Sequence, residues 1–375
     1  MKELQNILAR MREIESNGAK AVLATVVDVK GSSYRLPGAK MLILETGETL
    51  GTVSGGCLEA DVLERAKQVL KTGETQIVTY DTTANDDSVF SLNMGCRGVI
   101  RILLEPVRGN EFFAFVEECF QARLYGFAAT VIDREDSADL TIGTKFLTLE
   151  TDIMPFDENH ARFQELPTPL RSAILDVFRT GLPRCQKLLI AGSGNVEFFI
   201  EQIKPPLALV VFGAGADAVP LVRLAQELGW NVTVIDHRLA YATPERFPAA
   251  EVWIARAEDV NLNEIYDRNA VAVLMTHNFE RDKHALRRAL QGRFRYIGVL
   301  GPKRRTESLL QELANEGETF SDEQLKRLFA PVGLDIGADT PESIALSIIA
   351  EINAVLANRA GGFLRNRTGS IYERS

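Results

Sequence analysis

The chain contains few of the residues that build covalent or metal-held frameworks. Four cysteines and four histidines occur among 375 residues, and no two cysteines form a Cys-x-x-Cys pair. A disulfide scaffold or a dedicated zinc site needs more ligands at closer spacing, so the sequence argues against both. No run of about 18 uncharged apolar residues predicts a membrane span. Residues 1–16 form a charged amphipathic helical pattern rather than a signal peptide, so we expect a cytoplasmic protein.

An excess of positive charge is also missing. The 42 basic and 51 acidic residues give a net charge of −9, which argues against a large nucleic-acid-binding surface. The 46% of hydrophobic and 25% of charged residues are typical of a globular protein. A chain of 375 residues is too long for one ordinary core, so we expect two or three domains.

A glycine-rich turn between two apolar strands is the most informative stretch of the chain. An apolar run over 207–212 precedes Gly213-Ala214-Gly215, a helical pattern follows, and a second apolar run ends at Asp236. This is the βαβ unit of a dinucleotide-binding fold. Gly213 permits the tight turn, Gly215 lets the backbone approach a phosphate, and Asp236 has the spacing of the acid that binds a ribose hydroxyl. The pattern indicates the fold more strongly than it indicates the ligand.

Asp217 lies in the first turn of the helix after the glycines and has two interpretations. Its carboxylate would compete with a bound pyrophosphate for the positive helix end. Alternatively, it caps the helix. The sequence favours neither.

The remaining strand patterns divide the chain into three parts. The helix and strand patterns of residues 1–106 predict an α+β domain. Residues 107–205 form a β-containing middle region that we expect to extend this domain. Pro205-Pro206 marks the boundary to 206–375, where strands near 207–212, 231–236, 251–254, 271–276 and 295–300 alternate with helices. The expected fold class is therefore α/β: an N-terminal α+β domain followed by a Rossmann-like, doubly wound parallel sheet. A second glycine-rich stretch, 190–195, precedes no crossover helix and predicts a hairpin turn.

Two cysteines of the first domain lie in glycine-rich turns. Ser54-Gly55-Gly56 precede Cys57 and a helix, so free amides and the helix dipole would accept an anion there and lower the pKa of the Cys57 thiol. Glycines expose Cys96, and Arg97 favours its thiolate. Taken alone, each glycine-rich turn is explained equally well as a simple reversal of the chain, with a cysteine that packs against its neighbours. Together they favour a ligand site, whereas Cys119 and Cys185 are assigned to packing.

Charged residues follow two strands of the second half. His277 is a candidate general acid or base, a phosphate contact, or, as for most such histidines, a hydrogen-bonded capping residue. Lys303 and Arg304 open a helix, where cations oppose the dipole unless an anion binds. A solvated charged face is the alternative. Thr340 and Pro341 have the sequence of a helix start.

These motifs together resemble the xanthine dehydrogenase accessory protein family, XdhC/CoxI, over residues 10–105 and 207–360. The matching stretches are GSSYRLPGAKM, SGGCLEADV, GCRG, VVFGAGADAVPLVRLAQELGWNVTVIDHR, MTHNFERD, YIGVLGPKRRTESLL and GLDIGADTPESIALSIIAEI. The resemblance implies an accessory protein that binds molybdenum cofactor, supports its sulfuration and delivers it to a molybdenum hydroxylase of the xanthine dehydrogenase type. It also implies a cysteine desulfurase as partner.

The resemblance assigns roles to particular residues. Cys57 and Cys96 match family cysteines, one of which would contact molybdenum through a soft thiolate. Two departures stand out: Ala216 replaces a common histidine, and Arg97 replaces a glycine. The candidate cofactor-binding residues are Ser54, Gly55, Gly56, Cys57, Cys96, Arg97, Gly213, Gly215, Asp217, Asp236, His277, Lys303 and Arg304.

Two other functions stay open. An NAD(P)-dependent oxidoreductase would rest on Gly213, Gly215 and Asp236, although no clear donor pair for hydride chemistry accompanies them. A Rossmann half that serves only as a docking scaffold is the third possibility. A homodimer is expected because most oligomers are two-fold dimers, and neither a nucleic acid nor a membrane is expected as a partner.

Overall fold

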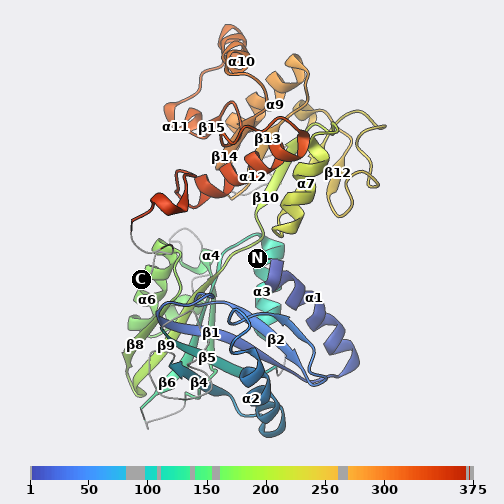
Figure 1. Ribbon diagram of the computed structural model, residues 1–375. Helices are drawn as coiled ribbons and strands as arrows, with labels where there is room; N and C mark the ends of the chain where they lie inside the picture. Colours follow the sequence, from blue (N-terminus) through green and yellow to red (C-terminus); the bar gives the residue numbers. More distant parts are fainter. Residues whose placement is uncertain are drawn as a thin grey trace. The chain divides into compact units, whose positions relative to one another are not determined.

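Two compact units make up the chain. The computed structural model describes residues 2–81, 98–107, 111–135, 140–153, 161–260, 269–368 and 371. The N-terminal unit comprises Glu3–Pro205, and the C-terminal unit comprises Pro206–Ile371. Figure 1 draws the first in blue to green and the second in yellow to red.

The N-terminal unit contains helices and strands in alternation. Its elements are α1 (Lys2–Asn17), β1 (Ala21–Gly31), β2 (Lys40–Leu44), β3 (Thr49–Gly51), α2 (Glu59–Thr72), β4 (Gln76–Asp81), β5 (Gly98–Pro106), α3 (Glu111–Ala122), β6 (Gly126–Arg134), β7 (Lys145–Leu149), α4 (Glu150–Ile153), α5 (Ala161–Glu165), α6 (Thr168–Thr180), β8 (Arg184–Ile190) and β9 (Gly194–Ile203).

A five-stranded antiparallel sheet of order β3-β2-β1-β5-β4 forms the first layer of this unit. Successive residues of β1 point to opposite faces, because side chains alternate along a strand. Val22 and Ala24 pack with α2 on one face. Ala21 and Leu23 pack with α1 and α3 on the other. Both faces are therefore covered, which explains why β1 is apolar almost throughout.

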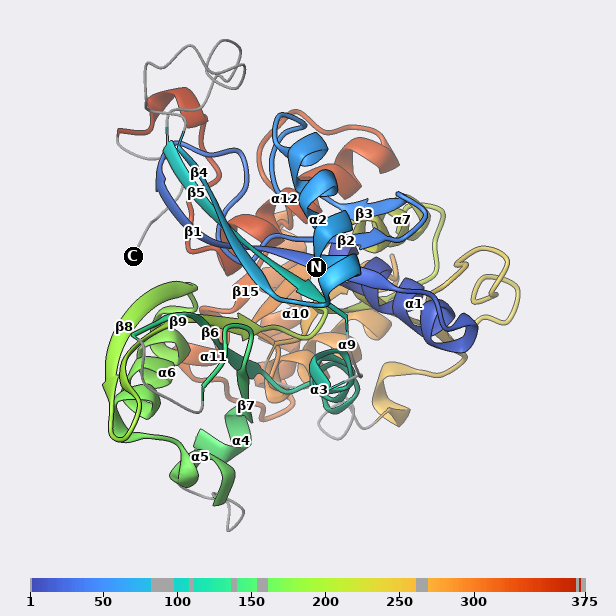
Figure 2. The same ribbon diagram turned by 90° about the horizontal axis from the view of Figure 1, so that it is seen from below.

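A second antiparallel sheet, of order β7-β6-β9-β8, comes from the middle region. It packs against the first sheet through a cluster that includes Val27, Leu103, Ile132 and Phe199. Helix α6 covers its other face, and Figure 2 shows α6 alongside β6, β8 and β9. Ile190 pairs with Gly194 across the turn between β8 and β9, so the predicted hairpin is confirmed.

A buried ion pair joins the two sheets. Lys40 of β2 donates from Nζ to both carboxylate oxygens of Glu201 in β9, at 2.7 and 2.9 Å. The two residues are only 5% and 7% exposed. Buried charges are tolerated in this way when each is paired and hydrogen-bonded.

The C-terminal unit is a parallel sheet between two layers of helices. Its elements are β10 (Ala208–Phe212), α7 (Ala218–Glu227), β11 (Asn231–Ile235), β12 (Glu251–Trp253), η1 (Ala257–Asp259), β13 (Val271–Leu274), α9 (Phe279–Gln291), β14 (Tyr296–Val299), α10 (Lys303–Asn315), α11 (Asp322–Leu325), β15 (Leu328–Phe329), α12 (Pro341–Leu356) and η2 (Leu364–Asn366).

The strand order β12-β11-β10-β13-β14-β15 is that of a doubly wound Rossmann sheet, and this confirms the predicted fold class. Helices α7 and α12 pack on one face, and α9 and α10 pack on the other. The order reverses between β10 and β13, which pair in parallel. Ligands of such sheets bind beyond the carboxyl ends of the strands near this reversal.

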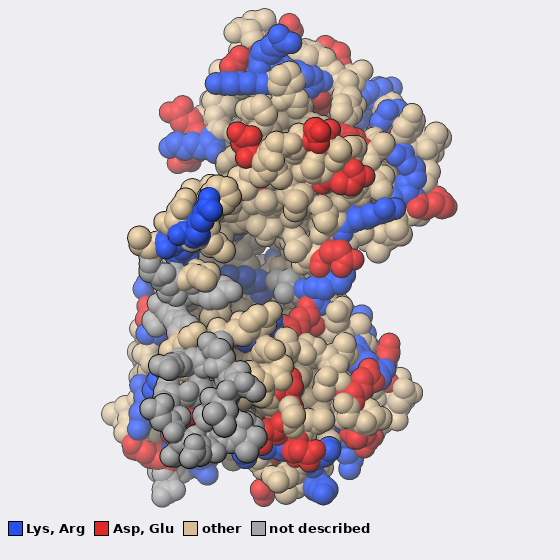
Figure 3. All heavy atoms as spheres, viewed as in Figure 1, with Lys and Arg blue, Asp and Glu red and all other residues tan. Residues whose placement is uncertain are grey.

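No helix among the described residues is long and apolar enough to cross a membrane. The face drawn in Figure 3 carries Lys and Arg side chains interspersed with Asp and Glu on both units. The described residues of this face therefore form no basic stripe, in agreement with the modest negative net charge.

The pair Lys40–Glu201 gives a prediction about stability. Replacing Lys40 by Met leaves the Glu201 carboxylate buried without its partner, so the free energy of unfolding falls by about 3 kcal/mol. The double variant Lys40→Met/Glu201→Leu removes both charges and recovers most of this loss. Urea unfolding followed by circular dichroism measures both values.

The matched control is Lys67→Met, which breaks an exposed pair with Glu64 and changes stability by less than about 0.5 kcal/mol. A double variant as unstable as the single one would contradict the interpretation, since packing rather than charge would then be lost.

Candidate functional site

The loop before α2 places the Ser54 side chain at its centre. Ser54 is 2% exposed, and its Oγ accepts hydrogen bonds from the amides of Gly56 at 3.2 Å and Leu58 at 3.0 Å. Leu58 takes the N-cap position of α2, but its side chain cannot cap. A hydroxyl four residues earlier therefore supplies the acceptor that the helix start needs.

The carboxylate of Glu59 turns back into the same loop. It accepts hydrogen bonds from the Ser54 amide at 2.9 Å, the Thr52 hydroxyl at 2.5 Å and the Ser54 hydroxyl. Partial burial acts to raise the pKa of Glu59, but these hydrogen bonds outweigh it and lower the pKa below its ordinary value. Of the amides expected to be free at Ser54–Gly56, that of Ser54 is therefore bonded to the Glu59 carboxylate and that of Gly56 to the Ser54 hydroxyl.

Cys57 is the exposed thiol of this loop. Its Sγ lies 3.7 Å from Ser54 Oγ, within reach of a weak S–H donor. The Ser54 hydroxyl in turn donates to Glu59. The three side chains thus form a hydrogen-bonded series, the Cys57–Ser54–Glu59 series, in which a buried hydroxyl and a carboxylate orient an accessible thiol. Sequence reasoning missed Glu59, although its position directly after Cys57-Leu58 was the available signal.

Two further loops reach the same end of the first sheet. Tyr34 packs over Gly55, where an added Cβ would lie 3.3 Å from its ring. Gly31 pairs with Gly98 across β1 and β5. A Cβ on Gly98 would lie 2.5 Å from the Lys30 carbonyl oxygen, so glycine is required there. Cys96 and Arg97 lie outside the described residues, and Gly98 is the first described residue after them.

The other two described cysteines are shielded. Burial raises the pKa of the Cys119 thiol to about 12, and the side chain lies in the core between α1, α3 and the sheets. Burial also raises the pKa of Cys185 to about 12, and its Sγ donates to the Val27 carbonyl at 3.1 Å. Both environments therefore favour the protonated thiol over the reactive thiolate.

In the C-terminal unit, the glycine turn has the geometry expected from its sequence. Gly213 adopts a φ of 113°, and an added Cβ would lie 2.6 Å from the Met275 carbonyl oxygen. Ala218 is fully buried at the start of α7. The turn therefore fits tightly against the end of β13.

A carboxylate occupies the space above this turn. A Cβ on Gly215 would collide with Asp217 Oδ1, so it is Asp217 that approaches the glycine backbone closely. Asp217 stands at the N-cap of α7, but its side chain makes no cap hydrogen bond. Instead, Asp217 Oδ2 lies 2.7 Å from His277 Nε2. This Asp217–His277 pair lies at the place where a dinucleotide fold receives pyrophosphate.

His277 has a left-handed backbone, with φ of 57°, and a side chain 63% exposed. The capping role expected for it belongs to the next residue: Asn278 is the N-cap of α9 and accepts from the Arg281 amide at 3.1 Å. His277 is therefore a partner of Asp217 rather than a cap.

Asp236 connects the glycine turn to the strand end beside it. Its Oδ2 accepts from the Ala214 amide at 2.8 Å, and its two oxygens accept from the Arg238 guanidinium at 2.9 and 2.6 Å. Burial acts to raise the pKa of Asp236, but the bonds from Arg238 and Ala214 outweigh it and lower the pKa to about 2. Ribose binding would have to replace these bonds, so the role predicted for Asp236 meets a competitor within the chain.

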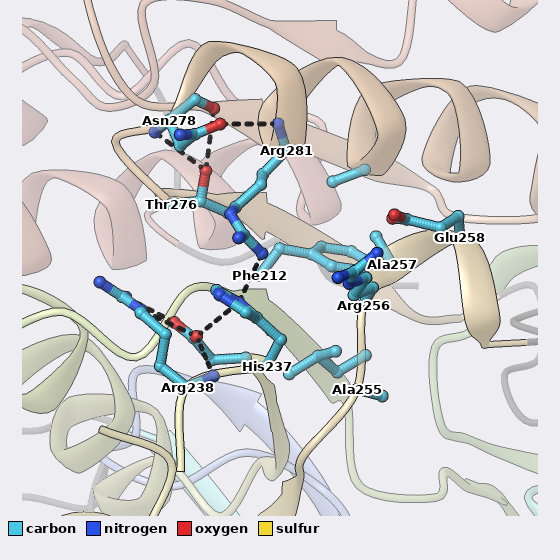
Figure 4. Close-up of a pocket in the computed structure, with 13 residues that line it drawn as sticks. Phe212, His237, Arg238, Ala255, Arg256, Ala257, Glu258, Thr276, Asn278 and Arg281 are labelled. Carbon is cyan, nitrogen blue, oxygen red and sulfur yellow. Dashed lines mark hydrogen bonds and ion pairs between the residues drawn. The ribbon is translucent and has the colours of Figure 1, made fainter. Parts of the chain in front are cut away.

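A cavity of about 250 Å³ lies beyond the ends of β10 to β13 (Figure 4). Sequence reasoning did not single out Arg256 or Arg281 in its wall. The signal was their position just after strands β12 and β13. The residues that line the cavity are Phe212, Ile235, Asp236, His237, Arg238, Ala255, Arg256, Ala257, Glu258, Thr276, Asn278, Arg281 and Ala285.

The remaining candidates do not join this cavity. Lys303 and Arg304 are exposed at the start of α10 and are not among its lining residues. Thr340 caps α12 by accepting from the Ser343 amide at 3.2 Å, with Pro341 in the first turn, so the predicted helix start is confirmed. Among the described residues, no group of three or more His, Cys, Asp or Glu side chains could hold a metal ion.

Comparison with known proteins gives matches to both units. The family model of the XdhC Rossmann domain matches residues 209–352, and that of the XdhC and CoxI family matches residues 15–81. A relative from Bacillus subtilis, named as a probable subunit of xanthine dehydrogenase, is 32% identical over 337 residues, covering 89% of this chain and 92% of the relative.

Two further relatives cover nearly the whole chain. The "Molybdenum cofactor insertion chaperone PaoD" of Escherichia coli is 24% identical, over 94% of this chain and 88% of its own length. A crystal structure described as a xanthine dehydrogenase from Bacillus halodurans is 29% identical, with a TM-score of 0.72 over 94% of this chain and 96% of that one.

The bonds of Asp236 predict a pH-dependent contribution to stability. Because the folded state lowers the pKa from 3.8 to about 2, the carboxylate stabilises the fold above pH 4 and this contribution is lost as the pH falls towards 2. Asp236→Asn should therefore lower the free energy of unfolding by about 2 kcal/mol at pH 7, and the difference from wild type should shrink between pH 4 and 2.

Both tryptophans, Trp230 and Trp253, belong to the C-terminal unit, so their fluorescence during urea unfolding reports on this unit. Asp335→Asn, at an exposed carboxylate of the same unit, is the matched control and should leave stability unchanged. A difference that stays constant down to pH 2 would show that ionisation of Asp236 does not carry the effect.

Proposed function

Since this chain belongs to the XdhC and CoxI family, we propose that it binds molybdenum cofactor, holds it while its terminal sulfido ligand is installed, and delivers it to a molybdenum hydroxylase of the xanthine dehydrogenase type. The cofactor is cargo in this proposal rather than a resident group. The observation that carries it is the exposed thiol of Cys57, held by the Cys57–Ser54–Glu59 series at the end of the first sheet.

The chemistry of this series fits a soft metal centre. A thiolate is a soft ligand of the kind that such a centre binds, and the metal itself keeps the sulfur deprotonated. The buried hydroxyl of Ser54 fixes the loop amides on either side of the thiol, and Glu59 fixes the hydroxyl. Cys57 is thus presented from a rigid helix start without being enclosed.

Among the described residues, Cys57 is the single side chain proposed to bind the metal, and such weak attachment suits a chaperone better than a storage site. One thiol bond is readily exchanged when the receiving enzyme offers a complete binding site. Cys96 belongs to the same proposal as a second contact, because the resemblance matches it, like Cys57, to a family cysteine. Arg97 and the Ser54–Gly56 turn remain candidate contacts for the anionic part of the cargo.

The proposed partners follow from the names of the relatives and from the chemistry of the cargo. A cofactor insertion chaperone and a probable component of xanthine dehydrogenase among the relatives support a molybdenum hydroxylase as the receiving enzyme. Installation of a sulfido ligand requires a sulfur donor, for which we propose a cysteine desulfurase. We further propose that the chain works as a homodimer.

An NAD(P)-dependent oxidoreductase is the weaker assignment. The Asp217–His277 pair lies over the glycine turn, and Asp236 is bonded to Arg238 and to the Ala214 amide. A dinucleotide would have to displace an internal carboxylate at the turn and compete with internal donors at the strand end.

Removal of the Cys57 thiol tests the proposed function. Wild-type protein mixed with molybdenum cofactor should retain molybdopterin through gel filtration, and Cys57→Ala should lose at least tenfold because the metal contact is gone. Molybdopterin is measured as its fluorescent oxidation product in the protein fraction. Cys185→Ala, which removes a shielded thiol of the same unit, is the control and should retain the wild-type amount.

Cys96→Ala completes the series and shows whether the second cysteine contributes. Absence of retention by wild-type protein, also after incubation with a desulfurase and its sulfur source, would overturn the proposal.

Glu59 gives an independent prediction about the support of this thiol. Glu59→Gln keeps the shape of the side chain but turns an acceptor into a donor facing the Ser54 amide and two hydroxyls. We expect a loss of about 1 to 2 kcal/mol in the free energy of unfolding at pH 7 and a severalfold loss of molybdopterin retention.

Because the pKa of Glu59 is lowered in the folded state, its advantage is present at neutral pH and is lost on acidification, as wild type itself becomes protonated. Glu64→Gln on the exposed face of α2 is the control. Full retention by Glu59→Gln, alongside loss in Cys57→Ala, would show that the thiol acts without this support.

A further inference from the structure

The cavity of the C-terminal unit has an apolar floor and a polar wall. Its apolar residues come from the ends of β10 and β11, from the segment after β12 and from α9: Phe212, Ile235, Ala255, Ala257 and Ala285. Thr276 and Asn278 add hydroxyl and amide groups. An apolar surface with a few convergent polar groups is the usual composition of a small-molecule site.

The wall carries an excess of positive charge. Arg238 is bonded to Asp236 and stacks on Tyr241, with 4.3 Å from its guanidinium carbon to the ring centroid. Arg256 and Arg281 also line the cavity, and the ion pairs found among the described residues include neither of them. Figure 4 places Arg256, Arg281 and His237 together, with Arg238 and Glu258 on opposite sides.

The surroundings of His237 reflect the charge of the cavity wall. Its Nδ1 lies 2.5 Å from Arg281 Nη1, so the neutral imidazole accepts from the guanidinium. Burial lowers the pKa of His237, and the charge of Arg281 lowers it further. Together these effects outweigh the opposing charge of Asp236, whose Oδ1 lies 3.2 Å from His237 Nδ1. A guanidinium that uses a neutral ring as its partner remains available to an anion, with its other donors in the planar fork that matches phosphate oxygens.

The size and surroundings of the cavity favour a ligand of about one nucleotide. Sites for drug-sized ligands usually measure roughly 300–1,000 Å³, and this cavity of about 250 Å³ lies just below that range. The Asp217–His277 pair occupies the neighbouring glycine turn, where the pyrophosphate of a dinucleotide would lie. The cavity thus lies beside the pyrophosphate position of the Rossmann site and does not include it.

We propose that this cavity binds a nucleoside monophosphate group, with the phosphate on Arg256 and Arg281 and the base over the floor formed by Phe212 and Ile235. In this arrangement Asp236 positions Arg238 and the Ala214 amide instead of binding ribose. The group belongs either to a free nucleotide or to the nucleotide end of a larger ligand, since both present the same chemistry. The proposal concerns the other unit and does not rest on the role of Cys57.

Isothermal titration of the full chain tests this proposal with AMP, CMP, inorganic phosphate and NADP as probes. Arg256→Gln and Arg281→Gln should each weaken the binding of AMP or CMP at least tenfold. Arg223→Gln, at an exposed position of α7 in the same unit, is the matched control and should bind as wild type does. Arg256 is exposed, so its replacement does not threaten folding.

Each outcome decides the proposal. Mononucleotides that bind more tightly than phosphate, with loss in both arginine variants, support it, and NADP binding no tighter than AMP shows that a single nucleotide fills the site. Phosphate binding equal to that of AMP and CMP would leave the base without a role and overturn it. So would the absence of binding, unchanged affinity in both variants, or NADP binding a hundredfold tighter than AMP.

Cys57→Ala separates this proposal from the proposed function. The variant should bind the mononucleotide with wild-type affinity even though it loses molybdopterin. Failure of the nucleotide titration with retention of molybdopterin would remove the cavity proposal alone.

Discussion

The buried carboxylate of Asp236 is the interaction on which the C-terminal site depends. It holds the Ala214 amide, which fixes the glycine turn, and it holds the Arg238 guanidinium, which forms one wall of the cavity. One side chain therefore ties the end of β10 to the end of β11. Without it, a buried amide would lack its acceptor and an arginine would lie free above apolar residues.

Internal carboxylates lie at both glycine-rich helix starts that the sequence offers as anion sites. In the N-terminal unit, Glu59 takes the amide and hydroxyl donors at the start of α2. In the C-terminal unit, Asp217 lies against Gly215 and bonds to His277. A glycine motif shows where backbone donors gather, but it does not show whether a ligand or the chain itself supplies the negative charge. The distinction changes the function that the motif supports.

The fold was largely predictable because its signals are local. The apolar strands and glycines of 207–300 identified the Rossmann sheet, and the observed order β12-β11-β10-β13-β14-β15 agrees with the predicted doubly wound class. The family was recognisable from the same motifs. Helix α6 and the short strand β15 were missed, since the first lies among polar and proline-rich segments and the second has two residues.

The candidate site was less predictable because tertiary contacts create it. Asp217 and His277 bond to each other, and Asp236 bonds to the Ala214 amide and to Arg238, so these side chains already have partners within the chain. Arg256 lies outside the quoted motifs and Arg281 lies within MTHNFERD, and the two meet only when the strand ends align. Their convergence depends on the topology rather than on any local pattern.

The exposure of Cys57 connects this protein to the redox state of its surroundings. Of the three described cysteines, it is the one open to solvent, while burial protects the thiols of Cys119 and Cys185. An accessible thiol is the first to be oxidised to a sulfenic acid, which no longer offers a soft thiolate. Cargo bound to the sulfur would block that reaction. The loaded protein would then protect its own thiol, and the empty protein would need reducing conditions to remain ready for the next cargo.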